Sequence, residues 1–370
     1  MHNKEPTILI VSSEISYKNG WGRVSLEISK SFHKHGTKII NICGDSSKYE
    51  KKIAIRNLQS LKYWKIKKII FTFIDLIKII FNLKGSFSHI LSTDEQSLIL
   101  SYWISKIYSV PLSCYLHGTY ALKMLNELNV HSHKKALTRA TNIFFPSSFT
   151  ANEFRKLVTL YDSKIKIIPL GVSDDFLNFP FSKKTRKNQL VTIGAVKERK
   201  GLLEILQAIS LIDKNHRPIL NVVGKLNHAD KYVSNIFKII EENRLKDTVI
   251  FHEQISDDAM IELMDISSIF ILPSKNTSKM NFEGFGLVFL EASSRFLPVI
   301  GSRECGNTDA IIHNKTGYLI EQGDIEDLKN KIYKLLKNPN LRQQMGENGR
   351  TFSERMTWSN TVKLILKNIK

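Results

Sequence analysis

Two glutamates beside a glycine-rich turn are the residues in this chain with the clearest chemical potential. Glu283 precedes the turn Gly284-Phe285-Gly286, and Glu291 lies in the apolar stretch that follows it. Glycines here allow backbone N–H groups to point outward at a helix start and form an anion site. Glu291 would lie about one helical turn further on, roughly 5–6 Å along the axis. An acid on each side of an anion site suits a ligand with hydroxyls on both sides of a diphosphate, as in a nucleotide sugar.

A second cluster contains positive charges. Lys197, Arg199 and Lys200 crowd the turn G-A-V-K-E-R-K-G, which follows a predicted strand at residues 190–193. Arginine is a bidentate donor to phosphate, and lysine acts as a point charge. The same charges are also found on solvated loops, so the turn alone leaves both interpretations open.

The N-terminal half offers His117 and a pair of glycines. His117 follows a predicted strand at residues 112–116, and open α/β sheets bind ligands at the carboxyl ends of their strands. Gly20 and Gly22 form a predicted flexible turn between a strand at residues 8–11 and a helix at residues 24–34. This turn is either a plain connection or a second point of ligand contact.

The composition indicates a large globular protein with anionic partners. The chain has 370 residues, is 42% hydrophobic and has a formal net charge of +19. Such a charge favours nucleic acid, acidic lipids or phosphorylated substrates, although a general Lys-rich composition would produce it too. The three cysteines have no spacing typical of disulfide frameworks or zinc sites, which favours a reducing compartment and predicts no metal site. The first residues lead straight into a strand and lack a signal-peptide pattern.

Strand and helix patterns alternate through both halves of the chain, which predicts two α/β domains. We place an N-terminal domain at residues 1–172 and a polar, basic linker at residues 173–188. A C-terminal domain follows at residues 189–350. We expect a helix at residues 351–370 to pack back toward the N-terminal domain.

An apolar stretch at residues 69–83 is shorter than the ~20 residues needed to span a bilayer. It is either a helix buried against a sheet or a helix lying on a membrane surface. Four basic residues just before it would then contact lipid phosphates: Lys62, Lys65, Lys67 and Lys68.

Several motifs, taken in order, resemble those of the retaining glycosyltransferases of family 4. The segment N-F-E-G-F-G-L-V-F-L-E-A matches the family's pair of glutamates with seven residues between them. The H-G-T at 117–119 and the turns P-S-S-F-T and I-P-L-G-V-S also match, so that the resemblance covers nearly the whole chain. It implies the GT-B fold, in which two Rossmann-like domains with parallel sheets face each other across a cleft.

The resemblance also implies an activity. The enzyme would be a hexosyltransferase that moves a sugar from a nucleoside-diphosphate sugar to a hydroxyl of a glycan or lipid-linked acceptor, with retention and without a metal or cofactor. Such enzymes serve cell-surface polysaccharide synthesis, including lipopolysaccharide. We therefore expect a cytoplasmic protein that associates peripherally with the inner face of the cell membrane.

The resemblance assigns roles to individual donor-site residues. Lys200 would neutralise the diphosphate, Glu291 would bind the ribose hydroxyls, and Glu283 would hold the transferred sugar and face its anomeric carbon. The backbone amides at one turn would contact sugar and phosphate: Phe285, Gly286 and Leu287.

In the N-terminal domain, Gly20 and Gly22 would let the domain close over the diphosphate, and His117 would lie near the sugar and acceptor.

Three positions depart from the family pattern. Ala195 stands where the family has an arginine, and Lys197 or Arg199 would have to supply that charge. Glu253 replaces a glycine near the expected nucleobase pocket, which leaves the base open. Asp309 stands in place of a glutamate and is one methylene shorter.

Two other classes of function compete with this interpretation. A nucleotide-sugar epimerase or a phosphorylase with the GT-B fold would use similar residues. A basic module that binds membrane or nucleic acid would explain the charge. The chain has no helix-turn-helix, RNA-recognition or zinc-finger motif, so we expect no nucleic-acid partner.

Overall fold

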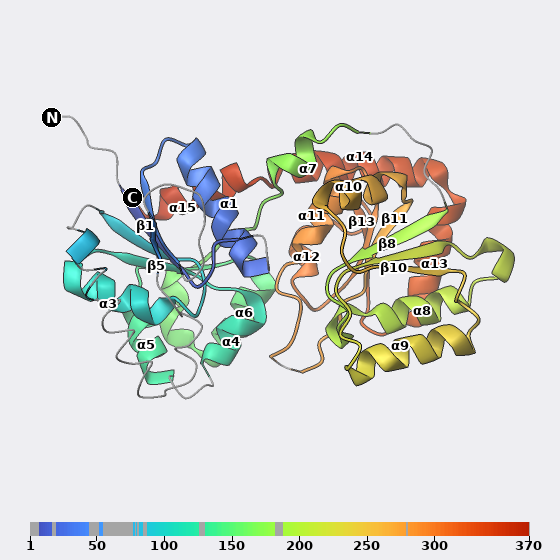
Figure 1. Cartoon of the computed structure of the whole chain (residues 1–370), viewed down its shortest axis with the longest axis horizontal. Coiled ribbons are helices and arrows are strands. Elements are labelled where there is room, and N and C mark those ends of the chain that lie inside the picture. The colour runs from blue at the N-terminus through green and yellow to red at the C-terminus, as the bar shows by residue number, and fades with distance from the viewer. Residues whose placement is uncertain are drawn as a thin grey trace. The chain divides into compact units, whose positions relative to one another are not determined.

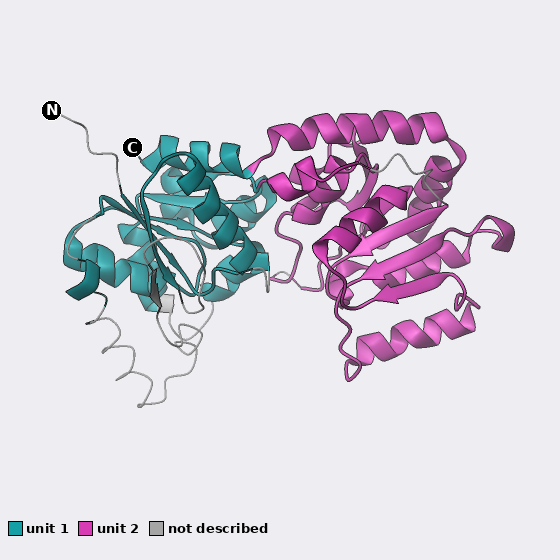
Figure 2. Ribbon diagram, turned by 45° about the horizontal axis from the view of Figure 1, so that its top comes forward, with its two compact units in different colours: residues 1–170, 358–370 teal, residues 171–357 magenta. Residues whose placement is uncertain are grey.

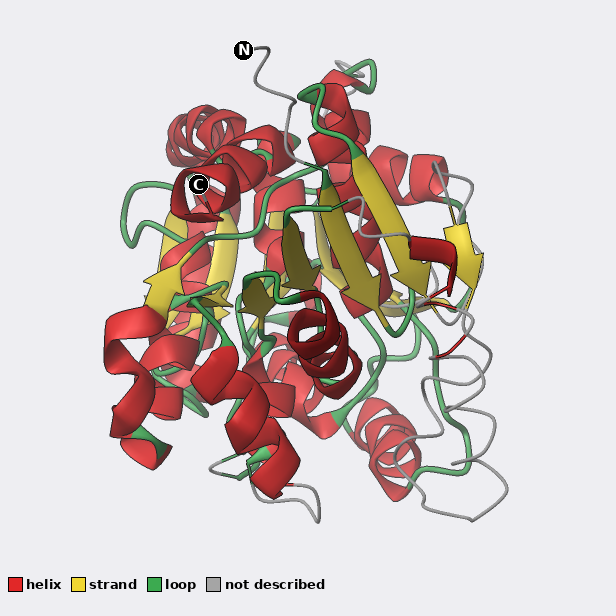
Figure 3. Ribbon diagram, turned by 90° about the vertical axis from the view of Figure 1, so that its left-hand side faces the viewer, coloured by secondary structure: helices red, strands yellow, loops and turns green. Residues whose placement is uncertain are grey.

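The structure is a computed structural model that describes residues 7–16, 20–43, 52–54, 77, 79, 81–83, 87–125, 130–181, 188–278 and 280–369. The chain folds as two compact units. Unit 1 comprises residues 1–170 and 358–370, and unit 2 comprises residues 171–357 (Figure 2). In each unit the strands of a parallel sheet lie between helices (Figure 3). The predicted α/β architecture with two parallel-sheet domains is therefore confirmed.

Unit 1 contains a seven-stranded parallel sheet in the order β3-β2-β1-β4-β5-β6-β7. Its central strands are runs of aliphatic residues buried along their whole length, as expected for a parallel sheet covered on both faces. The strands are β1 (Ile8–Ser12), β2 (Ile39–Cys43), β3 (Lys52–Ala54), β4 (His89–Ser92), β5 (Leu112–Tyr115), β6 (Asn142–Phe145) and β7 (Ile165–Ile167).

The helices of unit 1 include the last helix of the chain, which packs against α1 (Figure 1). Val362 and Ile365 of this helix are fully buried, and the hydroxyl of Thr361 donates to the carbonyl of Pro169 at 2.8 Å. The helices are α1 (Gly20–Lys34), α3 (Leu98–Tyr108), α4 (Gly118–Met124), α5 (Val130–Arg139), α6 (Ser148–Leu157), the 3₁₀ helix η2 (Thr159–Lys164) and α15 (Trp358–Ile369).

Unit 2 contains a six-stranded parallel sheet in the order β10-β9-β8-β11-β12-β13. One contiguous apolar core joins strands β8, β9 and β11 to helices α8, α9 and α13. The strands are β8 (Gln189–Ile193), β9 (Ile219–Val223), β10 (Val249–His252), β11 (Ile269–Leu272), β12 (Val299–Ser302) and β13 (Gly317–Ile320).

Helices α8, α9 and α13 cover one face of this sheet, and α10 and α11 cover the other (Figure 1). The helices are α7 (Asp174–Asn178), α8 (Leu202–Ser210), α9 (Lys231–Glu242), α10 (Asp257–Ile266), α11 (Leu287–Ser294), α12 (Asn307–Ala310), α13 (Ile325–Lys337) and α14 (Pro339–Arg355), with 3₁₀ turns η3 (Glu198–Lys200) and η4 (Lys214–His216).

The strand orders define one switch point in each sheet. In unit 1, β1 pairs with β2 on one side and with β4 on the other. In unit 2, β8 likewise pairs with β9 and β11. Connections leave the sheet in opposite directions at such points, and ligands bind in the crevice outside the carboxyl ends of these strands. Ligand sites are therefore expected after β1 and β4 and after β8 and β11.

The structure corrects the predicted linker. Residues 174–178 form α7 within unit 2, and Phe176 is buried there. Residues 182–187 of the predicted linker lie outside the described residues. The return to unit 1 comes at Trp358 rather than at residue 351, because α14 continues to Arg355 as part of unit 2.

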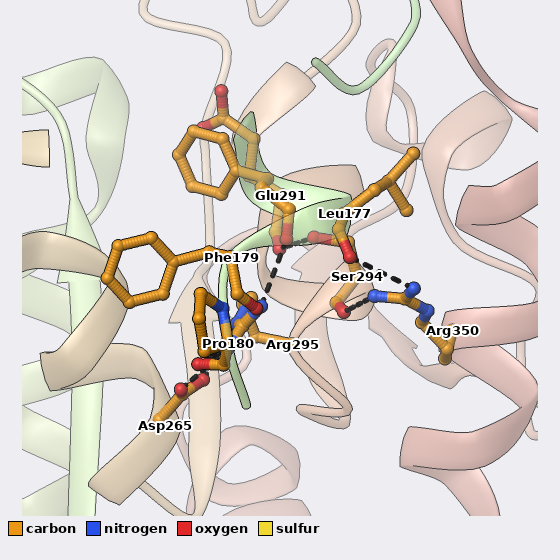
Figure 4. A network of polar contacts seen from close by, with 9 residues as sticks. Leu177, Phe179, Pro180, Asp265, Glu291, Ser294, Arg295 and Arg350 are labelled. Atoms are coloured by element: carbon orange, nitrogen blue, oxygen red, sulfur yellow. Dashed lines mark hydrogen bonds and ion pairs between the residues drawn. The ribbon is translucent and has the colours of Figure 1, made fainter. Parts of the chain in front are cut away.

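A buried arginine explains why α7 belongs to unit 2 (Figure 4). Arg295, at the end of α11, forms a two-point ion pair with Asp265 of α10, at 2.6 Å and 2.8 Å, and both side chains are 1% exposed. Its remaining N–H groups donate to the carbonyls of Phe176, Phe179 and Pro180 at 2.8–3.3 Å. A buried guanidinium needs this many acceptors, and it fastens the segment after α7 onto unit 2.

Gly20 and Gly22 were also placed wrongly. They form the first turn of α1 rather than a flexible turn before it. Gly22 is buried, and its carbonyl accepts a hydrogen bond from the amide of Ser16 at 3.2 Å. Helix formation therefore begins four residues earlier than the two glycines led us to expect.

Candidate active site

The cations of unit 2 lie in the turn directly after β8. Residues Glu198–Lys200 form the 3₁₀ turn η3, and Gly201 follows with φ of +72°. A Cβ at Gly201 would lie 2.1 Å from the carbonyl oxygen of Pro273, so only glycine permits this close approach to the end of β11. The turn after β8 is therefore held against the loop after β11.

The long polar loop after β11 is folded back on itself. The amide of Thr277 donates to the carbonyl of Asn281 at 3.1 Å, and the amide of Asn276 donates to the side chain of Gln322 at 2.7 Å. The loop ends at Glu283, whose carbonyl accepts from the amide of Gly306 at 2.8 Å. These contacts fix the backbone of Glu283 at the switch point.

The side chains of Arg199 and Lys200 both form ion pairs with Glu283. Its Oε2 lies 2.5 Å from Nη1 of Arg199 and 2.5 Å from Nζ of Lys200. The side chains are 13%, 22% and 20% exposed, respectively, so the cluster is shielded but reaches the surface. Burial alone would raise the pKa of Glu283, but the charges and hydrogen bonds of Lys200 and Arg199 outweigh it and lower this pKa to about 2.

The two basic residues that could replace the family's arginine at position 195, Lys197 and Arg199, have different surroundings in the structure. Arg199 contacts Glu283, whereas Lys197 is exposed and forms no ion pair with any described residue. Ala195 is exposed on the same turn. Lys197 precedes the 3₁₀ turn as its N-cap residue, and its role in donor binding stays a prediction.

Helix α11 begins directly behind this cluster. Gly286 precedes it with φ of +85°, and a Cβ there would lie 2.6 Å from the ring of Phe289. Phe285 is buried, and Leu287 is the first helical residue. Glu291 is buried one turn into the helix, as predicted from its spacing. The N–H of Phe289 donates to the carbonyl of Gly286 at 2.9 Å. The N–H groups of the two residues before it, at the start of α11, precede the intrahelical hydrogen bonds and can bind an anion.

Sequence reasoning missed the residues that support the cationic turn. Lys275 lies 2.9 Å from Glu204 and 3.3 Å from Glu198, and its amide donates to the carbonyl of Arg199 at 2.9 Å. The available signal was a lone lysine three residues after the end of a buried strand, at the edge of the sheet where ligands bind. Lys275 thus braces the backbone of Arg199.

Asn307 was missed as well. It is fully buried beside Gly286, and neither polar atom of its amide has a hydrogen-bond partner among the described residues. Its neighbour Asp309 is half-buried, and Thr308 donates to it at 3.4 Å.

Glu253, which stands where the family pattern has a glycine, is exposed and pairs with His228 at 3.3 Å.

The second polar cluster lies at the switch point of unit 1. Nε2 of His117 lies 2.7 Å from the carbonyl of Thr93, and because a carbonyl only accepts, the ring carries a proton on Nε2. Burial lowers the pKa of His117, although this hydrogen bond and the charge of Asp94 oppose the shift. The imidazole is therefore neutral near pH 7 and keeps Nδ1 as an acceptor.

Two consecutive acids surround this histidine, and sequence reasoning had singled out neither. Glu95 accepts the backbone N–H of His117. Burial raises the pKa of Glu95 to about 8, the hydrogen bond from His117 opposes this, and the charge of Asp94 adds to it. The Asp94 carboxylate accepts from Ser12, Ser13 and Ser97 at 2.7–3.1 Å. The sequence feature that could have pointed to Asp94 and Glu95 is a pair of consecutive acids shortly after a buried strand.

The first turn of α1 reaches the same region of unit 1. Trp21, between Gly20 and Gly22, packs edge-on against Tyr120 of α4, with 5.3 Å between the ring centroids. Tyr120 is two residues after Gly118, where α4 begins. The two glycines therefore flank an aromatic contact between two helix starts, and their role in ligand binding stays a prediction.

The sequence predicted neither a metal site nor a membrane-spanning helix. Within the described ranges, no group of three or more His, Cys, Asp or Glu side chains could hold a metal ion. The described helices include none with the length and apolar content needed to cross a bilayer. Lys62, Lys65, Lys67 and Lys68 lie outside the described residues, and the predicted membrane-surface helix stays a prediction.

Comparisons with known families follow the division into two units. The model of Glycosyltransferase Family 4 matches residues 18–176, and the model of Glycosyl transferases group 1 matches residues 173–352. Together the two matches cover residues 18–352, which include all the strands named above except β1. The chain belongs to the family 4 glycosyltransferases, as its motifs indicated.

Individual relatives are distant. An uncharacterized glycosyltransferase from Methanocaldococcus jannaschii is 28% identical over 260 residues, covering 70% of this chain and 68% of the relative. The capsular polysaccharide biosynthesis glycosyltransferase CapM of Staphylococcus aureus is 28% identical over 172 residues, covering 45% of this chain and 42% of CapM. The chain thus spans about two thirds of the first relative and under half of the second.

Among solved structures, Anabaena Alr3699/HepE in complex with UDP and glucose superimposes with a TM-score of 0.76 at 15% identity, and the alignment covers 99% of both chains. At this identity the similarity defines the fold, which is GT-B. The predicted fold class is thereby confirmed.

Proposed function

We propose that this glycosyltransferase moves a hexosyl group from a nucleoside-diphosphate sugar to a hydroxyl of a glycan or lipid-linked acceptor, with retention of configuration and without a metal. The observation that carries the proposal is the convergence of Arg199 and Lys200 on Glu283 at the switch point of unit 2. The structural relative solved with UDP and glucose supports the same class of donor.

The donor would bind unit 2. Arg199 and Lys200 would hold the diphosphate together with the first N–H groups of α11, since cations and helix starts both favour anions. Glu291, buried one turn into α11, would bind the ribose, and Glu283 would hold hydroxyls of the transferred sugar. The exposed pair of Glu253 and His228 joins the segments after β10 and β9, and the identity of the base is left to experiment.

The reaction breaks the bond between the anomeric carbon and the leaving phosphate oxygen. Negative charge grows on that oxygen, and Arg199 and Lys200 stabilise it more strongly than they stabilise the intact donor. The acceptor oxygen then bonds to the anomeric carbon on the same face, and its proton goes to the leaving phosphate oxygen. Glu283 would stabilise the positive charge that develops on the sugar ring.

The acceptor would bind unit 1. Neutral His117, with Nδ1 as an acceptor, and the protonated carboxyl of Glu95 are suited to hydrogen bonds with sugar hydroxyls rather than to ionic contacts. We infer from the net charge of +19 and from the capsular relative that the acceptor belongs to cell-surface polysaccharide synthesis.

A thermal-shift panel of nucleotide sugars tests this function. At ~100 Kd the true donor should stabilise the protein by about 2.7 kcal/mol, and product analysis with that donor should show transfer with retention. Release of sugar phosphate on addition of inorganic phosphate would identify a phosphorylase instead, and conversion of the donor without an acceptor would identify an epimerase. If no nucleotide sugar raises the melting temperature, the proposal is wrong.

We further propose that unit 1 associates peripherally with the inner face of the membrane. Trp103 and Ile107 lie one turn apart on α3 and are each 46% exposed, and Lys106 lies over the Trp103 ring at 5.5 Å. Aromatic and basic side chains on one helical surface suit an acidic lipid interface. Sedimentation with anionic vesicles should deplete the wild type but not the Trp103→Ser, Ile107→Ser variant. Equal sedimentation of the two would contradict this surface.

A further inference from the structure

Glu283 occupies the position where Arg199 and Lys200 would bind an external anion. Both cations approach the same carboxylate oxygen, Oε2, at 2.5 Å. Two donors on one oxygen resemble the way a phosphate oxygen is held in a cationic site. In this conformation a side chain of the protein itself therefore fills the anion position of the site.

The occupant is permanently charged. With a pKa of about 2, Glu283 is ionised throughout the physiological pH range, so it always neutralises part of the cationic charge. Oε1 of Glu283 makes no hydrogen bond to any described residue. The carboxylate is thus held by the two cations alone.

The carboxylate can be exchanged without unfolding the loop. The backbone carbonyl of Glu283 is bound by the amide of Gly306, and the backbone of Arg199 is bound by the amide of Lys275. Both anchors involve main-chain atoms of the two loops, whereas the ion pairs involve side chains only. Rotation of the Glu283 side chain would therefore release both cations while each loop keeps its position.

A diphosphate competes well for these cations. It carries at least two negative charges and several acceptor oxygens, against one charge on the carboxylate. Building on the proposed function, we propose that Glu283 is a built-in competitor for the donor: the diphosphate displaces its carboxylate from Arg199 and Lys200, and donor binding thereby releases Glu283 toward the sugar. A bare anion must then overcome the internal pair without the contacts that the sugar would offer.

This exchange predicts that loss of the Glu283 charge strengthens nucleotide binding and slows turnover in the same variant. In Glu283→Gln the competitor is neutral, so bare UDP or GDP should bind about tenfold more tightly than in the wild type, which corresponds to about 1.4 kcal/mol. Turnover should fall in the same variant. Calorimetric titration of both nucleotides against wild type and variant measures the affinity directly.

Glu326→Gln is the matched control. It removes the same charge from unit 2, but Glu326 is exposed and pairs only with Lys329 at 2.5 Å. Its nucleotide affinity should stay within twofold of the wild type. Wild-type binding together with equal or weaker binding in Glu283→Gln would overturn the inference and leave the proposed function standing. No binding of either nucleotide to either protein would count against the proposed function itself.

A double variant keeps the test independent of one substitution. Lys200→Gln should weaken nucleotide binding, because Arg199 alone remains and is still paired with Glu283. Adding Glu283→Gln should restore part of that affinity by freeing Arg199. Glu283→Ala replaces the glutamine variant if the latter does not fold. Failure of both double variants to recover affinity would also overturn the inference.

Discussion

Each sheet has a polar cluster at its switch point. The two clusters shift the pKa of a glutamate in opposite directions. Glu283, after β11, is neutralised by two cations, which lower its pKa to about 2. Glu95, after β4, is buried without a cation, and its pKa is raised to about 8. The same residue type is therefore ionised in unit 2 and protonated in unit 1 at neutral pH.

This difference teaches how one architecture can supply two kinds of binding surface. The cluster of unit 2 is built from charges that can exchange partners, which suits an anionic diphosphate. The cluster of unit 1 is built from hydrogen bonds between neutral groups around one carboxylate, Asp94, whose acceptor positions are filled by serines. Such a surface suits uncharged hydroxyls.

The largest effect should come from Glu283→Gln. Turnover with the cognate donor should fall by about 100-fold or more, because a neutral amide no longer stabilises positive charge on the sugar. Steady-state rates measure this, and retained binding of bare nucleotide would show that the variant is folded. Turnover within twofold of the wild type would remove Glu283 from the chemistry.

Asp94→Ala should chiefly affect stability. It removes an acceptor from the side chains of Ser12 and Ser13 and the backbone amides of Ser13 and Ser97, all buried in unit 1. We expect a loss of about 2–3 kcal/mol in the free energy of unfolding, measured by urea denaturation. An unchanged midpoint of urea denaturation would mean that the hydrogen bonds to Asp94 do not stabilise unit 1.

The two glutamates should also give opposite pH dependences. The pKa of Glu95 is raised, so its contribution to stability is complete below about pH 4.5 and is lost as the pH rises to about 8. The pKa of Glu283 is lowered, so its contribution is present above about pH 4.5 and is lost as the pH falls to about 2.

Glu95→Gln therefore tests unit 1. The variant should melt several degrees higher, relative to wild type, at pH 8 than at pH 5, because glutamine is neutral at both values. Thermal unfolding of the two proteins at both pH values measures this difference. Parallel pH profiles would show that Glu95 is ionised in the folded protein.

The smallest effect should come from Lys275→Gln. Lys275 supports the cationic turn through ion pairs with Glu198 and Glu204, whereas Arg199 and Lys200 contact Glu283 itself. Nucleotide affinity should fall only a few-fold, since each of these partly exposed ion pairs contributes at most about 1 kcal/mol. A loss as large as that of Lys200→Gln would mean that Lys275 contacts the ligand directly.

The sequence predicted most of the strands and the residues that meet in unit 2. Buried strands are runs of aliphatic residues, and the turns after them carry glycines and charges at short range. Glu283, Glu291, Arg199 and Lys200 were found from such local signals.

What the sequence did not reveal depends on contacts between distant segments. The segment after α7 read as a linker because its burial depends on Arg295 and Asp265, which lie far along the chain. The raised pKa of Glu95 depends on the packing around β4 and β5 rather than on its neighbours in sequence. The contact of Arg199 with Glu283 likewise joins residues that are 84 positions apart in the sequence.

The chain passes between the two units twice, at residues 170–171 and 357–358, and these two points lie close together. The amide of Val172 donates to the carbonyl of Met356 at 2.8 Å, and Val172 pairs with Thr357. The chain therefore enters and leaves unit 2 at neighbouring positions, and unit 2 is an insertion within unit 1. Domains with adjacent ends tolerate transplantation, because their removal leaves no gap to span. If unit 2 binds the donor as we propose, exchanging residues 171–357 between relatives would be a route to enzymes with a new donor and an unchanged acceptor.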